Sequence, residues 1–480
     1  MEKIVSLAKR RGFVFQSSEI YGGLNGCWDY GPLGVEMLNN LKQQWWKNMT
    51  YRENVEGLDA SILMHPRVWE ASGHVENFTD PMVDCKQCKS RYRVDILFED
   101  LSVKRKKDVL REVDPKRFEG QQKDEVIEAE FTKLLESPNG TTLVLAKLAC
   151  PNCGNKGTFT DARKFNLMFK TFIGPIEDSS AVVYLRPETA QGIFVNFLNV
   201  QSSSRQKIPF GIAQIGKAFR NEINTKNFLF RTREFEQMEM QFFVRPGTDE
   251  EWFEYWRGER MQWFFDLGMR KERLRWFQHP KEKLAHYAKD AYDIEYQFPF
   301  GWGEIEGIHN RTDFDLSRHE EFSGKGMKYY DEETKEKYIP YVIETSAGAS
   351  RSFMAFLVNS YAEEEAPTAE GTMEMRSVLK LHPKLAPIKA AIFPLVNRDG
   401  MPEFARKIEQ DLRPHFRVFY DDSGAVGRRY RRQDEAGTPF CITVDSQTLE
   451  DQTVTVRERD SMKQERVAAS LLRSYLAERL

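Results

Sequence analysis

The chain has 480 residues, of which 40% are hydrophobic and 30% charged, and its 70 Lys and Arg oppose 73 Asp and Glu. This composition excludes general disorder, and the length suggests roughly three domains. A formal net charge of −3 excludes a uniformly basic surface, so any nucleic acid must contact local patches. No apolar run approaches the roughly 18 residues that span a membrane, and six Cys are too few for a disulfide scaffold. We expect a cytoplasmic protein without a membrane partner.

The first half of the chain predicts helices followed by strands. Residues 1–13 fit a short amphipathic helix, and residues 101–140, dense in both signs of charge, predict an insertion of solvated helices. Short apolar runs broken by Pro and Gly predict strands from about 160 to 245. A helix is also expected after the breaker Pro32, and its apolar positions are Val35, Leu38, Leu41, Trp45 and Met49.

The second half predicts a helical segment at 249–290, a strand-rich segment at 296–346 and a helix over 348–364. Residues 381–390 contain two prolines and are the expected linker. Beyond them, strands at 390–396, 440–444 and 453–459 alternate with helices at 401–412 and 463–480, which indicates a small α/β domain.

Two CxxC pairs predict a metal site. Each pair offers two thiolates, and zinc held by four Cys has no open coordination position, so the site would be structural. The alternative is four reduced thiols without an ion. The charged segment lies between the pairs, so a metal would fix its base. The ligands would be Cys85, Cys88, Cys150 and Cys153.

A predicted strand at 233–243 returns antiparallel to one at 211–222. Period-two alternation places Met238, Met240 and Phe242 on a face that can pack against helices. The other face carries a polar row headed by an aromatic ring, which is either a solvated outer face or a binding surface. This row consists of Phe235, Gln237, Glu239 and Gln241.

Arginines and carboxylates near these strands suit a nucleotide. Guanidinium groups bind phosphate oxygens, and an aromatic ring beside cations suits a stacked purine. Arg351 opens a helix, where backbone N–H groups favour anions, although it can equally be a surface residue. Gly216-Lys217 lacks the rest of a P-loop. Glu304 and Glu306, two residues apart, are expected to point the same way on a strand, where carboxylates can bind Mg²⁺ or an ammonium group.

These segments resemble the motifs of class II aminoacyl-tRNA synthetases. FRNE (219–222) with FRTREFEQMEMQFF resembles motif 2, GASR (348–351) resembles motif 3, and the helix after WDYGPLG looks like motif 1. RPETAQGIF, HNRTDFDL, VIETSAGASR and GRRYRRQDEAGTPFCITVD look like the glycyl-tRNA synthetase family of the homodimeric α₂ kind. The similarity covers nearly the whole chain, and residues 101–140 are its least family-like part.

The resemblance implies an α+β fold with an antiparallel catalytic sheet and a C-terminal α/β anticodon-binding domain. The expected catalytic domain is 1–84 with 155–380, the insertion is 85–154 and the anticodon-binding domain is 385–480. The family activates glycine with ATP, releases pyrophosphate and transfers glycine to the 3′ end of tRNA(Gly). The implied partners are therefore ATP, Mg²⁺, glycine, tRNA(Gly) and a second copy of the chain.

The resemblance also assigns nucleotide contacts. Arg220 would hold the α-phosphate, Arg351 the γ-phosphate and Phe235 the adenine, while Glu304 would contact Mg²⁺ and ATP. The two arginines would be catalytic because they neutralise developing charge. The full ATP set is Arg220, Asn221, Glu222, Phe230, Arg231, Thr232, Arg233, Glu234, Phe235, Glu304, Ile305, Gly348, Ala349, Ser350 and Arg351.

A second implied set binds glycine, with carboxylates on the ammonium group and a tight pocket that excludes larger side chains. It consists of Arg93, Glu188, Phe235, Glu236, Gln237, Met238, Glu239, Arg311, Glu344, Thr345, Ser346, Ala347 and Gly348.

Other interpretations stay open from the sequence alone. A synthetase-like RNA-binding or accessory protein without catalysis would be expected to lack the phosphate arginines, which are present. A ligase for another carboxylic acid on the same scaffold is the third interpretation.

In the C-terminal region, 17 Lys and Arg against 15 Asp and Glu give a net charge of only +2 for residues 381–480. GRRYRRQDE (427–435) either binds RNA through Tyr430 and its arginines or forms a helix with ion pairs to Asp434 and Glu435.

Overall fold

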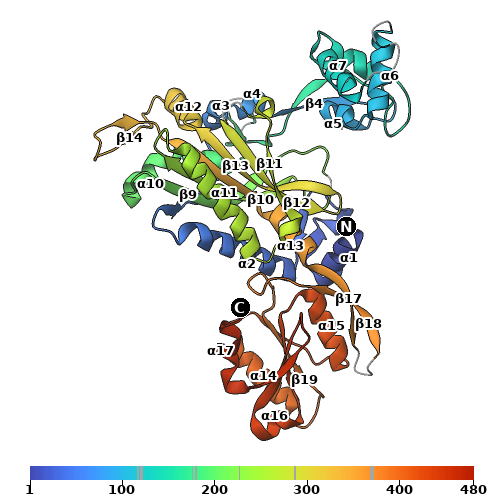
Figure 1. The fold of residues 1–480 in the computed structure, drawn as a ribbon, viewed down its shortest axis with the longest axis vertical. Helices are drawn as coiled ribbons and strands as arrows, with labels where there is room; N and C mark the ends of the chain where they lie inside the picture. Colours follow the sequence, from blue (N-terminus) through green and yellow to red (C-terminus); the bar gives the residue numbers. More distant parts are fainter. Residues whose placement is uncertain are drawn as a thin grey trace. The chain divides into compact units, whose positions relative to one another are not determined.

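The computed structural model describes residues 1–480 except 116–117, 119–122, 176, 179–180, 226, 286–287 and 368–371. The chain divides into two compact units, and Figure 1 gives the element labels. The first unit comprises Met1–Ser72, Glu188–Phe219 and Thr225–Leu480. The second comprises Gly73–Pro187 and Arg220–Asn224.

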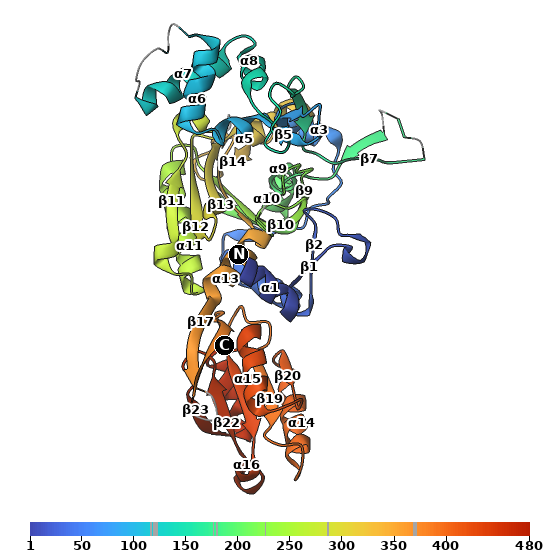
Figure 2. The same cartoon turned by 90° about the vertical axis from the view of Figure 1, so that its right-hand side faces the viewer.

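A seven-stranded sheet with the order β11-β12-β13-β16-β10-β9-β3 is the centre of the first unit (Figure 2). Neighbouring strands pair antiparallel except β3 with β9, which are parallel. The expected antiparallel catalytic sheet is therefore present. Its strands are β3 (Val55–Gly57), β9 (Phe210–Phe219), β10 (Glu234–Val244), β11 (Leu274–Gln278), β12 (Asp290–Phe298), β13 (Gly301–Thr312) and β16 (Tyr341–Gly348).

Helices cover both faces of this sheet. The larger core packs α2 (Pro32–Thr50), α11 (Asp249–Asp266) and α13 (Ala349–Ser360) against one face. Met238, Met240 and Phe242 lie in this core, as their alternation predicts. Helices α9 (Ala190–Val195), α10 (Phe197–Ser204) and α12 (Phe314–Ser323) contribute to a second core with Phe210, Ile212 and Phe243 of the sheet. The polar row of β10 points away from the larger core.

Several element predictions are wrong in detail. Helices α9 and α10 occupy part of the predicted strand region, α12 interrupts 296–346, and β11 lies in the segment predicted as helical. Short apolar runs do not distinguish a buried helix from a buried strand, which explains these errors. On α2, Leu38, Leu41, Trp45 and Met49 are buried as predicted, but Val35 is exposed and Met37 is buried in its place.

The C-terminal part of the first unit is a five-stranded sheet with the order β20-β19-β21-β22-β23, as expected of an α/β domain. The segment 463–480, predicted as one helix, instead contains β23 and α17. The predicted linker is packed, because Leu381, Leu385 and Ala386 are buried. The elements are β19 (Ala390–Pro394), α14 (Met401–Leu412), β20 (Val418–Tyr420), α15 (Val426–Ala436), β21 (Phe440–Val444), α16 (Ser446–Asp451), β22 (Thr453–Glu458), β23 (Gln464–Ala468) and α17 (Leu472–Ala477).

Smaller elements complete the first unit. They include the amphipathic helix expected at the start of the chain, which ends at Gly12 in a left-handed conformation. They are α1 (Glu2–Arg11), β1 (Val14–Gln16), β2 (Trp28–Tyr30), α3 (Pro66–Ala71), β14 (Tyr329–Tyr330), β15 (Lys337–Tyr338), β17 (Tyr361–Pro367) and β18 (Met373–Leu379).

The second unit has its own hydrophobic core. Strands pair in the order β5-β4-β6, and the charged segment forms helices, as predicted. These helices are not simply solvated, because Val109, Leu110, Ile127 and Phe131 are buried together. The elements are α4 (His74–Asn77), β4 (Thr79–Asp84), β5 (Arg91–Arg93), α5 (Val94–Glu99), α6 (Val103–Val113), α7 (Asp124–Glu136), α8 (Gly140–Lys147), β6 (Arg163–Asn166), β7 (Lys170–Phe172) and β8 (Val182–Tyr184).

A β-bulge in β13 overturns one prediction about the glutamates. Glu304 pairs with Glu295 and Glu306 with Ile294, so Ile305 is an extra residue between them. The bulge breaks the period-two alternation, and the two carboxylates do not point the same way. Glu306 is fully buried, where it accepts a 2.6 Å hydrogen bond from Arg260 of α11. Glu304 is exposed.

Candidate active site

Two rows of cross-strand neighbours build a polar surface in the middle of the large sheet. One row runs His309–Glu344–Gln241 across β13, β16 and β10. The next runs Gly307–Ser346–Glu239–Gln214 and continues into β9. Directly opposed residues on neighbouring strands present their side chains on the same face. The sheet register thus brings the predicted Glu239, Glu344 and Ser346 together.

The polar row of β10 is buried, so its interpretation as a solvated outer face is wrong. Glu239 is 1% exposed and Gln241 is fully covered. Gln241 Nε2 donates to Glu239 Oε1 at 2.8 Å and to Glu344 Oε2 at 2.7 Å, and the Thr189 hydroxyl donates to Glu239 Oε2. Burying a polar group costs free energy unless it is hydrogen-bonded, and these bonds satisfy both oxygens of Glu239.

Glu344 is the best-partnered carboxylate of the cluster. Arg311 donates to its Oε2 at 2.9 Å, and His309 Nδ1 lies 2.6 Å from its Oε1. Arg311 is itself held by Asp315 through two hydrogen bonds of 2.8 and 2.9 Å. These contacts fix the orientation of Glu344 on the sheet.

Glu188 is held at the edge of the same cluster. It immediately precedes Thr189, the N-cap of α9, and its Oε1 accepts a 3.0 Å hydrogen bond from Gln191 Nε2. Gln191 Nε2 also donates to Asp315 at 3.1 Å, and the side-chain oxygen Oε1 of Gln191 lies 2.8 Å from His319 Nε2. The predicted Glu188 is therefore linked to Arg311 through Gln191 and Asp315.

The environment sets the pKa values of the two central carboxyls apart. Burial raises the pKa of Glu239 well above its usual value, and the charges of Glu344 and Glu188 raise it further. Burial alone would also raise the pKa of Glu344, but the charge of Arg311 and the hydrogen bond with His309 lower it to about 2. Glu344 is consequently ionised, while Glu239 resists ionisation unless a cation enters beside it.

Arg351 lies in the first turn of α13 and contacts two other predicted ATP residues. Its Nε donates to the Phe230 carbonyl at 3.0 Å, and its guanidinium stacks 4.6 Å from the centre of the Phe230 ring. One terminal nitrogen lies 3.0 Å from Glu304 Oε2. Both side chains remain partly accessible, and the contacts with Phe230 and Glu304 hold the Arg351 guanidinium in place.

The other predicted site residues of the first unit differ in whether their side chains are accessible to a ligand. Met238, Ala347, Ala349 and Ile305 have their side chains in the hydrophobic core, so only their backbone can meet a ligand. Glu236 faces Lys42 at 3.0 Å, and Ser350 accepts from the Tyr30 hydroxyl at 3.0 Å. The remaining residues lie at the ends of β10 and β16 or in the loop before β10, and they are Arg231, Thr232, Arg233, Glu234, Phe235, Gln237, Thr345 and Gly348.

Four predicted residues belong to the second unit, and they are Arg93, Arg220, Asn221 and Glu222. Arg220 donates from Nε to the Pro187 carbonyl at 3.0 Å, and its guanidinium lies 5.3 Å from the centre of the Phe78 ring. Arg93 lies 3.1 Å from Asp80 and 2.5 Å from Asp95. The backbone N–H of Asn221 donates to Leu167 at 2.7 Å, and Glu222 is buried.

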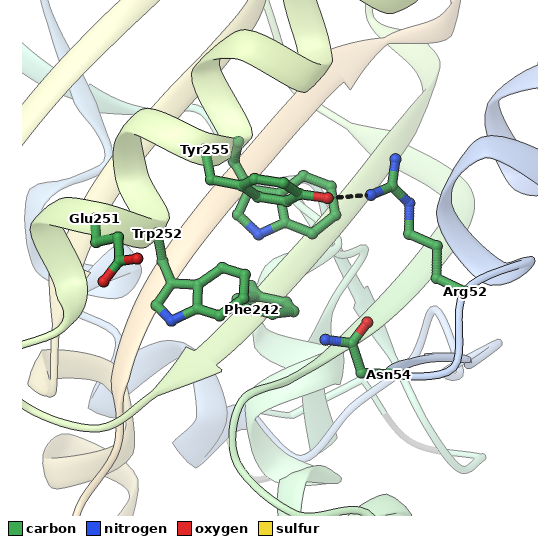
Figure 3. Close-up of a pocket in the computed structure, with 7 residues that line it drawn as sticks. Arg52, Asn54, Phe242, Glu251, Trp252 and Tyr255 are labelled. Carbon is green, nitrogen blue, oxygen red and sulfur yellow. Dashed lines mark hydrogen bonds between the residues drawn. The ribbon is translucent and has the colours of Figure 1, made fainter.

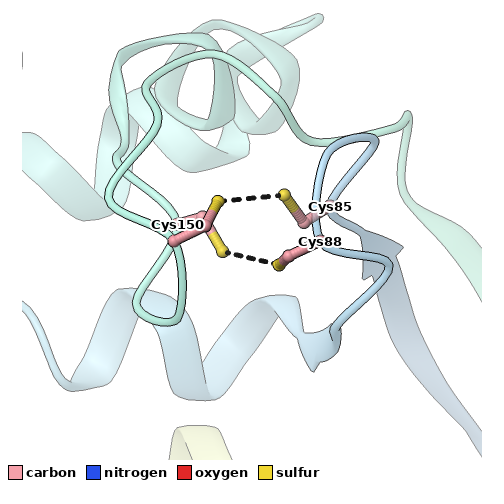
Figure 4. A group of neighbouring side chains, drawn as sticks. Cys85, Cys88 and Cys150 are labelled. Atoms are coloured by element: carbon pink, nitrogen blue, oxygen red, sulfur yellow. Dashed lines mark hydrogen bonds between the residues drawn. The ribbon is translucent and has the colours of Figure 1, made fainter.

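The two CxxC knuckles face each other, and Figure 4 shows their thiols turned toward a common centre. The four sulfurs lie within 4.8 Å of one another. Sγ of Cys85 lies 3.7 Å from that of Cys153, and Sγ of Cys88 lies 3.6 Å from that of Cys150. A tetrahedral zinc ion with bonds of about 2.3 Å requires sulfur separations of about 3.8 Å. The cluster is therefore compatible with zinc.

A separate cavity of about 230 Å³ lies at α11 and the connection between α2 and β3 (Figure 3). Its walls include Phe242, Trp252 and Tyr255, and Arg52 donates to the Tyr255 hydroxyl at 2.7 Å. None of the predicted site residues lines it. This cavity is therefore not part of the carboxylate cluster.

The sequence did not single out Thr189, Gln191, His309 and Asp315, which complete the cluster. They lie inside or beside the segments RPETAQGIF and HNRTDFDL, which carried the family resemblance. Their proximity in sequence to Glu188 and Arg311 is the one feature of the sequence that could have identified them as site residues. The contacts they make depend on sheet register, which a period-two pattern does not supply.

Comparison with known proteins identifies the family. The chain is 57% identical to a glycine–tRNA ligase of Treponema denticola over 99% of this chain and 96% of that protein. It is 54% identical to one of Thermobifida fusca over 100% and 98%, and 56% identical to one of Borreliella burgdorferi over 99% and 96%. The chain belongs to the glycine–tRNA ligase family.

Three family models match successive parts of this glycine–tRNA ligase family member. A glycyl-tRNA synthetase insertion domain matches residues 80–167, the class II tRNA synthetase core domain (G, H, P, S and T) matches 171–361, and an anticodon-binding domain matches 389–479. A solved prolyl-tRNA synthetase of Cryptosporidium parvum shares the fold, with a TM-score of 0.61 at 13% identity over 99% of this chain and 76% of that one. Among the described residues, no helix is both long and apolar enough to span a membrane.

Because the pKa of Glu239 is raised in the folded protein, ionisation of this carboxyl at higher pH lowers the stability of the fold. Glu239→Gln removes this pH-dependent loss of stability. A group whose pKa is higher in the folded state stabilises the fold fully below its unfolded pKa of about 4.3, and this contribution is lost as pH rises through the folded pKa. The Tm of the Gln variant relative to the original protein should therefore increase as pH rises above the unfolded pKa of about 4.3. Scanning calorimetry across this range measures the difference.

The control is Glu234→Gln, which removes an exposed carboxylate from the same strand. Its Tm should run parallel to that of the original protein. A constant Tm difference for Glu239→Gln across the range would contradict the assignment.

Proposed function

We propose that the buried carboxylates and the arginines around them perform the reaction of this family. As a member, the chain is an ATP-dependent ligase that charges tRNA with glycine. Glu188, Glu239 and Glu344 would surround the glycine ammonium group, and Ser346 would lie beside them. The observation that carries this proposal is the pair of buried carboxylates on one sheet face, Glu239 and Glu344, with the partly buried Glu188 interacting with both.

The same surroundings would explain how the smallest amino acid is selected. Glycine offers no side chain to grip, so selection requires a pocket in which a larger substituent at Cα meets packed or polar groups. Arg311, held by Asp315, keeps Glu344 ionised and in place. A methyl group among these buried polar atoms would displace their hydrogen-bond partners, which is costly.

Activation requires attack by the glycine carboxylate on the α-phosphorus of ATP, with pyrophosphate as the leaving group. No protein nucleophile is needed, so the protein contributes position and charge neutralisation. Arg220 would contact the α-phosphate, Arg351 the γ-phosphate, and Phe235 the adenine ring. Asn221, Glu222 and residues 230–234 would complete the nucleotide site.

Magnesium fits beside Arg351, because carboxylate oxygens are its preferred ligands. Burial raises the pKa of Asp293 to about 6, and the charge of the exposed Glu304 is the second cause of this rise. These two carboxyls would hold the ion, which would supply charge neutralisation at the phosphates. Glu304 would leave its ion pair with Arg351 when ATP binds.

Zinc held by the four Cys would have a structural role. We also propose that the enzyme is cytoplasmic and that it works as a homodimer. Strand β3, which follows α2, is an edge of the large sheet, and an edge strand can extend its pairing to another chain. Light scattering should give the mass of two chains, and the mass of one chain would contradict the dimer.

Arg351→Ala or Arg220→Ala should lower glycine-dependent ATP–pyrophosphate exchange by roughly 10²- to 10³-fold, because each removes a donor to transition-state charge. Exchange measured with glycine, alanine and serine also separates this function from a ligase for another acid. No exchange with any of them would favour a non-catalytic accessory protein.

Arg398→Ala is the matched control, since Arg398 is an exposed arginine of the C-terminal domain. It should keep full exchange. Melting curves establish whether each variant is folded, and near-normal exchange by folded Arg351→Ala would refute its role.

Replacing Cys85 and Cys153 together by Ser should reduce zinc from about one ion per chain to a trace, because two of four ligands are lost. Elemental analysis of the purified protein measures the zinc. Cys27→Ser, outside the cluster, should retain it. Absence of zinc from the original protein would end this proposal.

A further inference from the structure

His309 is a basic side chain among the carboxylates of the large sheet. It lies on β13, opposite Glu344 of β16 and two residues beyond Gly307. Gly307 lies between Ser346 and Asp293, so the polar surface extends onto β12. Among the described residues that pair along these two rows, His309 is the one with a basic side chain.

The two nitrogens of the His309 ring have different surroundings. Nδ1 lies 2.6 Å from Glu344 Oε1, and because Glu344 is ionised, Nδ1 donates the proton of this hydrogen bond. Nε2 makes no hydrogen bond within the part of the chain that the structure describes. The His309 side chain is 22% exposed, compared with 5% for Glu344, so a ligand can reach the ring.

The absence of a side chain at Gly307 keeps the approach to Nε2 open. A β-carbon at this position would stand 3.1 Å from Nε2 and 3.4 Å from Asp293 Oδ1. Any larger residue would therefore obstruct the nitrogen. The other oxygen of Asp293, Oδ2, lies 2.8 Å from His279 Nε2, which holds this carboxyl in place. Nε2 and Asp293 Oδ1 thus lie beside the same uncovered backbone position.

Glycine needs a cation on this surface as well as carboxylates, because it carries both an ammonium group and a carboxylate. Arg311 does not supply that cation, since its Nε, Nη1 and Nη2 already donate to Asp315 and Glu344. Burial lowers the pKa of His309, but the hydrogen bond with Glu344 and the charge of Glu344 outweigh burial and raise it above its usual value. A protonated imidazole donates from both nitrogens.

The spacing of the two contacts fits an α-amino acid. Nδ1 and Nε2 belong to one ring, so a group on Nε2 lies within the width of this ring from a group on Glu344 Oε1. The ammonium group and the carboxylate of glycine are joined through one carbon, and one molecule can occupy both places.

We propose that His309 is a further substrate-binding residue whose Nε2 donates a hydrogen bond to the glycine carboxylate, while its Nδ1 holds Glu344 for the ammonium group. The inference rests on the proposed function, which supplies glycine as the substrate. It adds to the glycine site a residue outside the set that the family resemblance implies.

Two amide variants separate the roles of the two ring nitrogens. The amide nitrogen of Asn reaches the place of Nδ1, and that of Gln reaches the place of Nε2. His309→Asn should therefore keep the bond to Glu344 but raise the KM for glycine in ATP–pyrophosphate exchange roughly 10- to 100-fold, because a hydrogen bond to a charged group is lost. His309→Gln should recover most of this loss. The KM for ATP should stay unchanged in both variants.

Ethylamine distinguishes a substrate contact from a role that acts only through Glu344, since it carries an ammonium group without a carboxylate. It should inhibit glycine-dependent exchange by the original protein and by His309→Asn with equal inhibition constants. Weaker inhibition of the His309→Asn variant would mean that the ring acts through Glu344, and this result would overturn the proposal.

His415→Asn is the matched control, since His415 is an exposed histidine of the C-terminal domain. It should keep the original KM for glycine, and melting curves establish that each variant is folded. An original KM for glycine in folded His309→Asn would refute the contact. Absence of exchange by the original protein would instead refute the proposed function, so the two failures are distinguishable.

Discussion

The arrangement of the site depends on the ion pairs that hold Glu344. Arg311 bridges Glu344 on β16 and Asp315 on α12, and all three side chains are buried. A buried charge without a partner is strongly destabilising, so the cluster persists only as a connected set. Because Arg311 neutralises Glu344, the neighbouring Glu239 can be buried as well. The fold thereby keeps two carboxyl groups together on one sheet face.

The sequence predicted the face of the strand on which each residue of β10 lies, but it did not predict which residues of neighbouring strands are paired. Alternation correctly separated Met238 and Met240 from Glu239 and Gln241 on β10. It did not give the pairing of β16 with β10 and with β13, which places Glu239 opposite Ser346 and Glu344 opposite His309. Register depends on contacts between strands distant in sequence, and no local pattern contains that information.

Errors in the sequence prediction have a common physical origin. The spacing of Glu304 and Glu306 indicated one shared direction, yet the bulge at Ile305 sends Glu306 to Arg260 in the core and leaves Glu304 beside Arg351. Likewise, Arg429 and Arg432 beside Tyr430 looked available to RNA but bind carbonyls and a carboxylate of the domain. In both cases tertiary contacts override what the residue types suggest in isolation.

Gly303 leaves this region little tolerance for change. A β-carbon at this position would stand 2.7 Å from the ring of Phe230, far inside van der Waals contact. That ring also packs against Phe298 and Phe300, which limits its retreat. Since the carbonyl and the ring of Phe230 both support Arg351, even an alanine here would disturb a guanidinium on another element. The absence of a side chain at Gly303 is therefore a condition for the observed positions of Phe230 and Arg351.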